Sequence, residues 1–218
     1  MKREISSALS LKRIVITLIL FFLVPVIQRV IYTLNPNETL SYMFALNLVG
    51  AVMMIYNWNL FALHYNRAKK NPGDTLIYTL IGCVFIGLWA WFNSSILRGN
   101  VLLPDPAVLK NNIFAAPAVF AAYTVIQAEI VSMSFKCLTD HMKIHSREVI
   151  IILVSGFAFG LLYTIAFTPL IPEQFIPAYF FNTILVSMLS YLYNQSGNFI
   201  SGMLAWSIVL SVLIAVSL

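Results

Sequence analysis

Long apolar runs constrain this chain more than any other feature of its sequence. Runs of about 20 residues recur from end to end, and each is long enough to cross the hydrocarbon core of a bilayer as an α-helix. Apolar and polar residues do not alternate within them, as they would in the strands of a membrane β-barrel. Because backbone polar groups in lipid must be satisfied within the segment itself, the runs predict helices.

Composition supports the same class of protein. Hydrophobic residues make up 60% of the 218 residues and charged residues only 10%, whereas soluble domains carry about 25% charged residues. So few charges cannot cover a surface that faces water. We therefore predict an all-α, polytopic transmembrane helical bundle, with membrane lipid as its surroundings.

The apolar runs are separated by segments with turn chemistry, and together they predict about seven spans. The turn signals are Asn35-Pro36-Asn37, Asn71-Pro72-Gly73-Asp74, Pro104-Asp105-Pro106, the pair Pro169 and Pro172, and Ser196-Gly197-Asn198. The predicted spans are 11–33, 40–63, 75–97, 113–136, 148–168, 175–194 and 197–217. We divide the chain into an N-terminal three-span region, 1–112, and a core of four spans, 113–218. No small-residue cleavage site follows the first span, so we interpret it as a retained signal anchor.

Lysine and arginine predict the orientation of the bundle. If the N-terminus lies inside the cell, ten basic residues fall on the inner side and three on the outer side, which is a strong positive-inside bias. The inner residues are Lys2, Arg3, Lys12, Arg13, Arg67, Lys69, Lys70, Lys136, Lys143 and Arg147, and the outer ones are Arg29, Arg98 and Lys110. The net charge of +5 therefore reports topology, and we expect no nucleic-acid partner.

Cysteine and histidine give no sign of a metal site or a disulfide. Cys83 lies within a span and Cys137 at the inner face, and we interpret Cys83 as a small buried hydrophobe. The pair His141 and His145 has i, i+4 spacing but lacks the glutamate of the zinc-protease motif, so we interpret it as a solvated loop. His64, at the inner end of the second span, is expected to snorkel to the surface. We expect neither a metal nor a cofactor.

Glu129 is the one acidic residue well inside a predicted span. An ionised carboxylate at that depth costs at least about 2.5–3.5 kcal/mol on insertion scales, so such a residue is a candidate for function. The alternative is a polar packing residue that is hydrogen-bonded to neighbours such as Tyr163.

Other polar and small residues in the spans are typical of helix packing. Buried amides usually hydrogen-bond helices to one another. Ser155-Gly156-x-x-x-Gly160 is a stripe of small residues suited to a close helix contact. The amides are Asn47, Asn57, Asn59, Asn93 and Asn182.

Three segments of the core carry a family resemblance. They are Ala128-Glu129-Ile130-Val131-Ser132-Met133, Phe159-Gly160-Leu161-Leu162-Tyr163, and the stretch from Ser196 to Leu210 that includes Trp206. In order and spacing they resemble the Glu-Glu-x-x-x-Arg, Phe-x-x-x-His and His-x-x-x-Asn motifs of the CPBP family, the CAAX-type and bacteriocin-processing membrane proteases also called Abi. The resemblance covers 113–217 and implies a CPBP-like four-helix core in a bacterial plasma-membrane protein.

Departures from the family motifs bear on activity. The resemblance implies a catalytic site in which glutamate and histidine activate water. A second histidine and an asparagine would then stabilise the oxyanion. Only Glu129 is retained here. The other catalytic positions carry Ala128 for Glu, Met133 for Arg, Tyr163 and Trp206 for the two histidines, and Leu210 for Asn, while Phe159 matches its motif.

These replacements argue against hydrolysis. Tyrosine, with a pKa near 10, is a poor general base, and tryptophan can only donate a hydrogen bond.

The predicted depths of these residues in the membrane differ. Helix arithmetic at 1.5 Å per residue places Glu129 roughly 10 Å, Trp206 roughly 13 Å and Tyr163 roughly 22 Å above the inner face.

Three functions remain open. The first is a non-catalytic scaffold or regulatory partner of another membrane or cell-envelope protein, as in members of the family similar to lysostaphin-resistance protein A. The second is a divergent CAAX-type intramembrane endopeptidase that uses Glu129. The third is a membrane protein that binds a lipid or peptide, or one that confers bacteriocin immunity.

Overall fold

The regular elements are all helical in the part of the chain that the computed structural model describes, which is residues 10–95, 116–141, 148–168 and 171–216. Pro104-Asp105-Pro106, Pro169 and residues 142–147, with His145, lie outside these ranges. The helices are α1 (Leu11–Leu34), α2 (Glu38–Tyr56), α3 (Trp58–Lys70), α4 (Pro72–Ser95), α6 (Ala116–Lys136), α7 (Glu148–Phe167), α8 (Pro172–Ser196) and α9 (Ile200–Val216), and a π-helical turn, η1 (Cys137–His141), extends α6.

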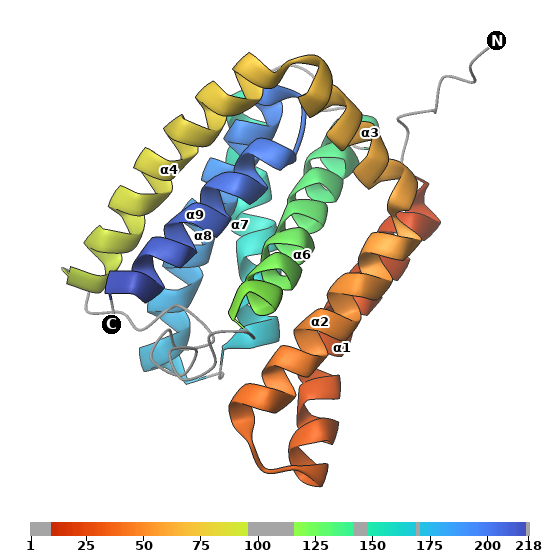
Figure 1. The fold of residues 1–218 in the computed structure, drawn as a ribbon, viewed down its shortest axis with the longest axis vertical. Helices are drawn as coiled ribbons and strands as arrows, with labels where there is room; N and C mark the ends of the chain where they lie inside the picture. The colour runs from red at the N-terminus through yellow and green to blue at the C-terminus, as the bar shows by residue number, and fades with distance from the viewer. Residues whose placement is uncertain (1–9, 96–115, 142–147, 169–170, 217–218) are drawn as a thin grey trace.

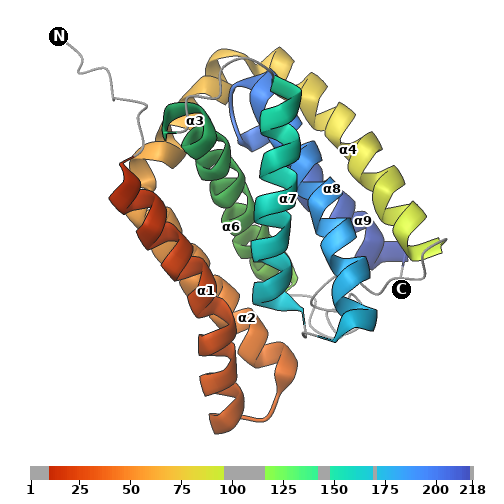
Figure 2. The same cartoon turned by 180° about the vertical axis from the view of Figure 1, so that it is seen from behind.

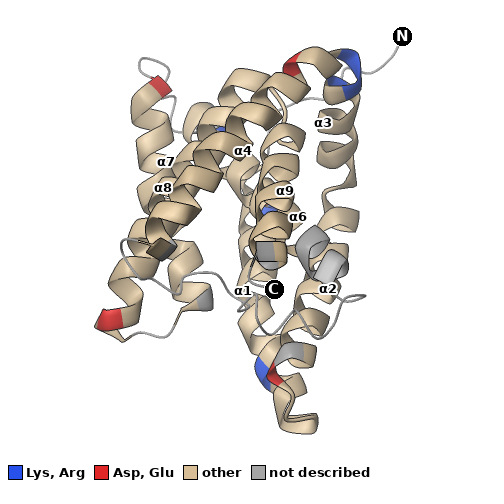
Figure 3. Ribbon diagram, turned by 60° about the vertical axis from the view of Figure 1, so that its left-hand side comes forward, with Lys and Arg blue, Asp and Glu red and all other residues tan. Residues whose placement is uncertain are grey.

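Several helices have the length and composition of membrane spans. α1, α4, α7 and α8 each qualify, and the bent pair α2–α3 would make a fifth span. α9 contributes a shorter apolar helix over Ile200–Leu213. The prediction of an all-helical membrane bundle is confirmed at this level. Figure 3 shows a ribbon with few charges along most of its length.

The predicted span 40–63 is wrong as a single helix. α2 ends at Tyr56, and α3 leaves it at an angle of 81°. The bend keeps its hydrogen bonds, because the N–H of Asn57 donates to the carbonyl of Met53 at 2.9 Å and the carbonyl of Asn57 accepts from Leu60 at 2.8 Å. α2 alone, at 1.5 Å per residue, reaches about 28 Å, which is close to the thickness of the hydrocarbon core.

α6 lies in the middle of the bundle (Figure 1). α1 and α2 pack on one side of it, and α8 and α9 on the other. α4 packs on α8 and α9, away from α1 and α2, so the three N-terminal spans do not lie together. The turn between α1 and α2 extends beyond the other described helices, as Figure 2 also shows.

The stripe of small residues lies at the contact between α7 and α8, as the sequence indicates. A Cβ atom added at Gly160 would lie 2.7 Å from the Cα of Thr183, and one at Gly156 would meet the hydroxyl of Ser187. A polar bond beside this contact joins the same helices, with the Asn182 side chain donating to the Thr164 hydroxyl at 3.0 Å. Asn182 therefore has the packing role expected of it.

The turn between α8 and α9 requires a glycine. Gly197 caps α8 in the left-handed conformation, with φ of 65°. An added Cβ would meet no atom within 4 Å. The cost of a substitution would therefore come from the left-handed backbone conformation and not from a steric clash.

Replacing Gly197 with alanine is expected to lower the free energy of unfolding by about 1 kcal/mol, because the left-handed region is costly for a residue with a Cβ. Gly197→Asn should lose less, since asparagine tolerates this region. Chemical unfolding in detergent would measure both variants. Equal losses would show that the backbone conformation is not the cause.

Candidate functional site

Glu129 lies near the centre of the bundle and is 0% exposed. Its Oε2 accepts a hydrogen bond from Asn57 Nδ2 at 3.0 Å, and the same Nδ2 lies 3.1 Å from the Thr17 hydroxyl. Thr17 and Asn57 are also fully buried. The cluster of Thr17, Asn57 and Glu129, which we call the buried polar cluster, therefore joins α1, the α2–α3 bend and α6.

Two oxygens of the buried polar cluster lack a hydrogen-bond partner among the described residues. They are Glu129 Oε1 and Asn57 Oδ1. Asn57, rather than the expected alternative partner Tyr163, donates to the carboxylate. The sequence marked Asn57 as a packing amide, but Thr17 carries no signal that sets it apart from other threonines in an apolar helix.

Tyr163 and Trp206 lie in a separate group of aromatic side chains. The ring of Tyr123 lies 5.8 Å from that of Tyr163 and 6.5 Å from that of Trp206, measured between ring centroids. Tyr123 precedes Glu129 by six residues on α6, which corresponds to about 9 Å along the helix axis. Tyr163 and Trp206 thus both lie beside Tyr123, a residue that sequence reasoning did not single out.

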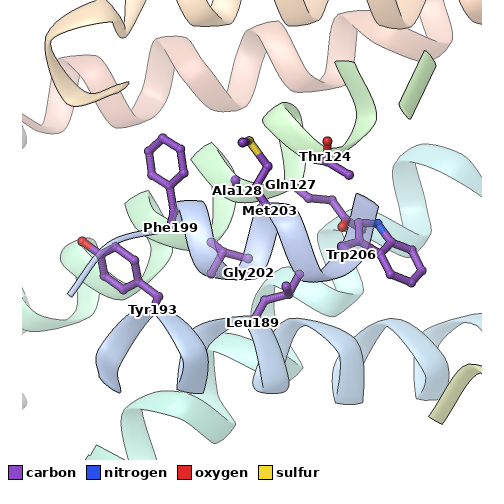
Figure 4. A pocket seen from close by; sticks show the side chains of 10 residues that line it. Thr124, Gln127, Ala128, Leu189, Tyr193, Phe199, Gly202, Met203 and Trp206 are labelled. Carbon is purple, nitrogen blue, oxygen red and sulfur yellow. The ribbon is translucent and has the colours of Figure 1, made fainter. Parts of the chain in front are cut away.

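A small cavity lies between α6, α8 and α9, and Figure 4 shows the side chains around it. Its volume is about 10 Å³, which is at the lower limit for one water molecule. Ala128 and Trp206 line it, and Trp206 Nε1 has no hydrogen-bond partner in the described part of the chain. The other lining residues are Thr124, Gln127, Val131, Leu189, Tyr193, Phe199, Gly202 and Met203.

Glu129 does not face this cavity. The cavity-lining residues of α6 recur at positions 124, 127, 128 and 131, which share one face of the helix. At about 100° per residue, Glu129 lies roughly 150° around the helix from the middle of that face. It contacts the α1 and α2 side instead, so the structure separates Glu129 from the cavity beside Trp206.

Three further residues that the sequence resemblance singled out, Met133, Phe159 and Leu210, belong to the apolar core or pack against it. Met133 is 3% exposed and Leu210 is 5% exposed, while Phe159 is half-buried against the core. None of these three side chains carries a hydrogen-bond donor.

Histidine and cysteine form no metal-binding group with acidic side chains in the described part of the chain. His141 ends η1, and its side chain, like that of His145, is outside the described side chains. Cys83 and Cys137 are both half-buried, so Cys83 is less enclosed than expected. His64 is 0% exposed, with its ring 4.7 Å from Phe199 and 5.4 Å from Tyr193. The expectation that it snorkels is wrong, because α3 turns its face toward the α8–α9 turn.

Comparison with known proteins adds no relative. No family model, curated protein or solved structure matches the chain.

Proposed function

We propose that the protein is a non-catalytic membrane scaffold or regulatory partner of another membrane or cell-envelope protein, with a degenerate CPBP-like core. The proposal includes seven spans, in which α6 and α9 also cross the bilayer. It places the protein in a bacterial plasma membrane with its N-terminus in the cytoplasm.

The enclosure of Glu129 carries this proposal. Hydrolysis by a general base requires a water molecule and the scissile bond within hydrogen-bond reach of that base. Glu129 is fully buried, its described partner is the amide of Asn57, and the nearby cavity is water-sized and lies on another face of α6. Tyr163 and Trp206 are enclosed too, at 4% and 1% exposed. This arrangement favours a packing role for the former catalytic positions over peptide cleavage.

The distribution of charge supports the proposed orientation. Six basic residues of the described part fall where α1 begins, along the second half of α3 and where α6 ends: Lys12, Arg13, Arg67, Lys69, Lys70 and Lys136. These ends lie at one side of the bundle, and Arg29 lies toward the opposite end of α1. Such an excess is typical of the cytoplasmic side.

A groove between α4 and α8 is the face that we propose for the partner. Its volume is about 310 Å³, and its lining is Gly82, Phe85, Ser187, Met188, Tyr191 and Leu192. Helices associate in lipid through close packing at small residues rather than through hydrophobic burial. A transmembrane helix of the partner fits this lining better than a charged ligand does.

The test is gentle purification of the tagged chain from its native membrane, followed by mass spectrometry. The proposal predicts a stoichiometric membrane or cell-wall enzyme that is lost in the double variant Phe85→Ala with Tyr191→Ala. Phe44→Ala with Phe157→Ala is the matched control, because both phenylalanines are exposed on other helices, and it should retain the partner. A partner-free protein that cleaves a membrane-anchored peptide, with cleavage lost in Glu129→Gln, would contradict the proposal and favour the endopeptidase.

A further inference from the structure

α3 is too short and too polar to cross the membrane by itself. Its 13 residues reach about 20 Å at 1.5 Å per residue, whereas a span needs about 30 Å. The helix has Arg67, Lys69 and Lys70 in its last turn. It turns away from α2 by 81° at the end of the bundle where α1 begins (Figure 1).

One face of α3 packs against the rest of the protein. Leu60, His64 and Ala68 are buried on it. The Phe61 ring lies 5.6 Å from that of Phe199, and Arg67 donates from Nη1 to the carbonyl of Gly197 at 3.1 Å. These contacts with the α8–α9 turn fix the orientation of α3. They therefore determine which side chains of α3 remain exposed.

The exposed side of α3 carries aromatic and basic side chains, together with Asn59 and Asn66. Trp58 is 55% exposed and Tyr65 is 56% exposed, and Lys69 and Lys70 are exposed as well. At about 100° per residue, Trp58, Tyr65 and Lys69 fall within roughly 40° of one another on the helix, and Lys70 lies about 100° further round the exposed side. Tryptophan and tyrosine concentrate at the level of lipid head groups, and lysine extends from there to anionic groups.

Charge around this face favours an anionic ligand. α3 contains no acidic residue, and the exposed Asp74 follows one turn into α4. Lys12 and Arg13 begin α1 nearby, and the Arg13 guanidinium lies 6.0 Å from the ring centroid of Tyr56, two residues before Trp58. Basic segments beside a membrane attract anionic lipids of the cytoplasmic leaflet.

We propose that α3 lies in the plane of the membrane surface and that its exposed face, formed by Trp58, Tyr65, Lys69 and Lys70, binds the head groups of anionic phospholipids. The aromatic rings lie at the level of the head groups, and the two ammonium groups pair with lipid phosphates. This inference is independent of the proposed scaffold function, because it concerns the lipid contact of one helix and not a protein partner.

The test uses quenching of Trp58 fluorescence by brominated lipids. The full chain is reconstituted in phosphatidylcholine vesicles that contain a small fraction of brominated phosphatidylglycerol or, separately, brominated phosphatidylcholine. Subtracting the quenching measured for Trp58→Phe isolates the signal of Trp58 from those of the other tryptophans. We expect brominated phosphatidylglycerol to quench Trp58 more than brominated phosphatidylcholine, and the difference to fall as salt is added.

Charge variants make the test specific. Lys69→Gln with Lys70→Gln should lower the preference for the anionic lipid, by about five-fold for each lysine if both contact the surface. Lys69→Arg with Lys70→Arg keeps both charges and should keep the preference. Equal quenching by the two lipids in the wild-type protein would overturn the proposal. Absence of quenching by either lipid would also overturn it, since Trp58 would then be covered by protein.

Discussion

Replacing Gly160 with alanine is expected to lower the free energy of unfolding by about 1–3 kcal/mol, the usual cost of overpacking. The added Cβ would lie 2.7 Å from the Cα and 2.8 Å from the backbone nitrogen of Thr183. Backbone atoms cannot rotate away as a side chain can, so α7 and α8 must separate. The separation would also strain the nearby bond from Asn182 to Thr164, which is 3.0 Å long. Chemical unfolding in detergent measures the effect.

Gly73→Ala is the matched control for this substitution. Gly73 lies in the first turn of α4, and an added Cβ there would meet no atom within 4 Å. Alanine should therefore leave the stability unchanged or raise it by up to about 1 kcal/mol. If both alanine variants behave alike, close packing at Gly160 does not explain the presence of glycine.

Replacing Asn57 with leucine is expected to cost about 1–3 kcal/mol, because Glu129 and Thr17 would lose their shared donor while fully buried. The loss should be larger if the carboxylate is ionised, since burial of an unpaired charge is the more costly case. Asn47→Leu is the control on the same helix. Asn47 is half-buried and donates within its own helix, to the carbonyl of Met43 at 2.9 Å, so its variant should stay within about 0.5 kcal/mol.

A double variant separates the lost hydrogen bond from a change in the bend. Replacement of both partners of a buried hydrogen bond by apolar groups of similar shape can be nearly neutral. Asn57→Leu with Glu129→Met should therefore recover most of the stability lost in Asn57→Leu alone. Failure to recover it would mean that Asn57 acts through the α2–α3 bend and not through Glu129.

Much of the fold could be predicted from the sequence, because long apolar runs and turn residues are local signals. The turn at Asn35-Pro36-Asn37 matches the boundary between α1 and α2, and Gly197 ends α8. The bend at Asn57 could not be predicted in this way. No proline or glycine marks it, and Trp58 to Leu63 continues the hydrophobic pattern of α2. The basic and polar second half of α3 was the one available hint.

The site could be predicted only in part. Glu129 is unusual in an apolar helix, and that rarity is visible in the sequence. Its partner is set by the face of α6 on which it lies and by the packing of α1 and α2 against that face. Both depend on tertiary structure, which the sequence pattern does not reveal. Tyr163 was therefore a reasonable candidate partner, and Thr17 could not be identified.

Glu129 is 0% exposed among the described helices, and the reactivity of a cysteine at that position measures this enclosure. Cys83 and Cys137 are first replaced by alanine, and Glu129→Cys, purified in detergent, is then treated with a charged thiol reagent. Asp74→Cys, at an exposed position of α4, serves as the accessible control. Our account predicts that the cysteine at position 129 reacts only after unfolding, while the control reacts at once. Comparable rates in the folded protein would reveal a water-filled path to the carboxylate and contradict the account.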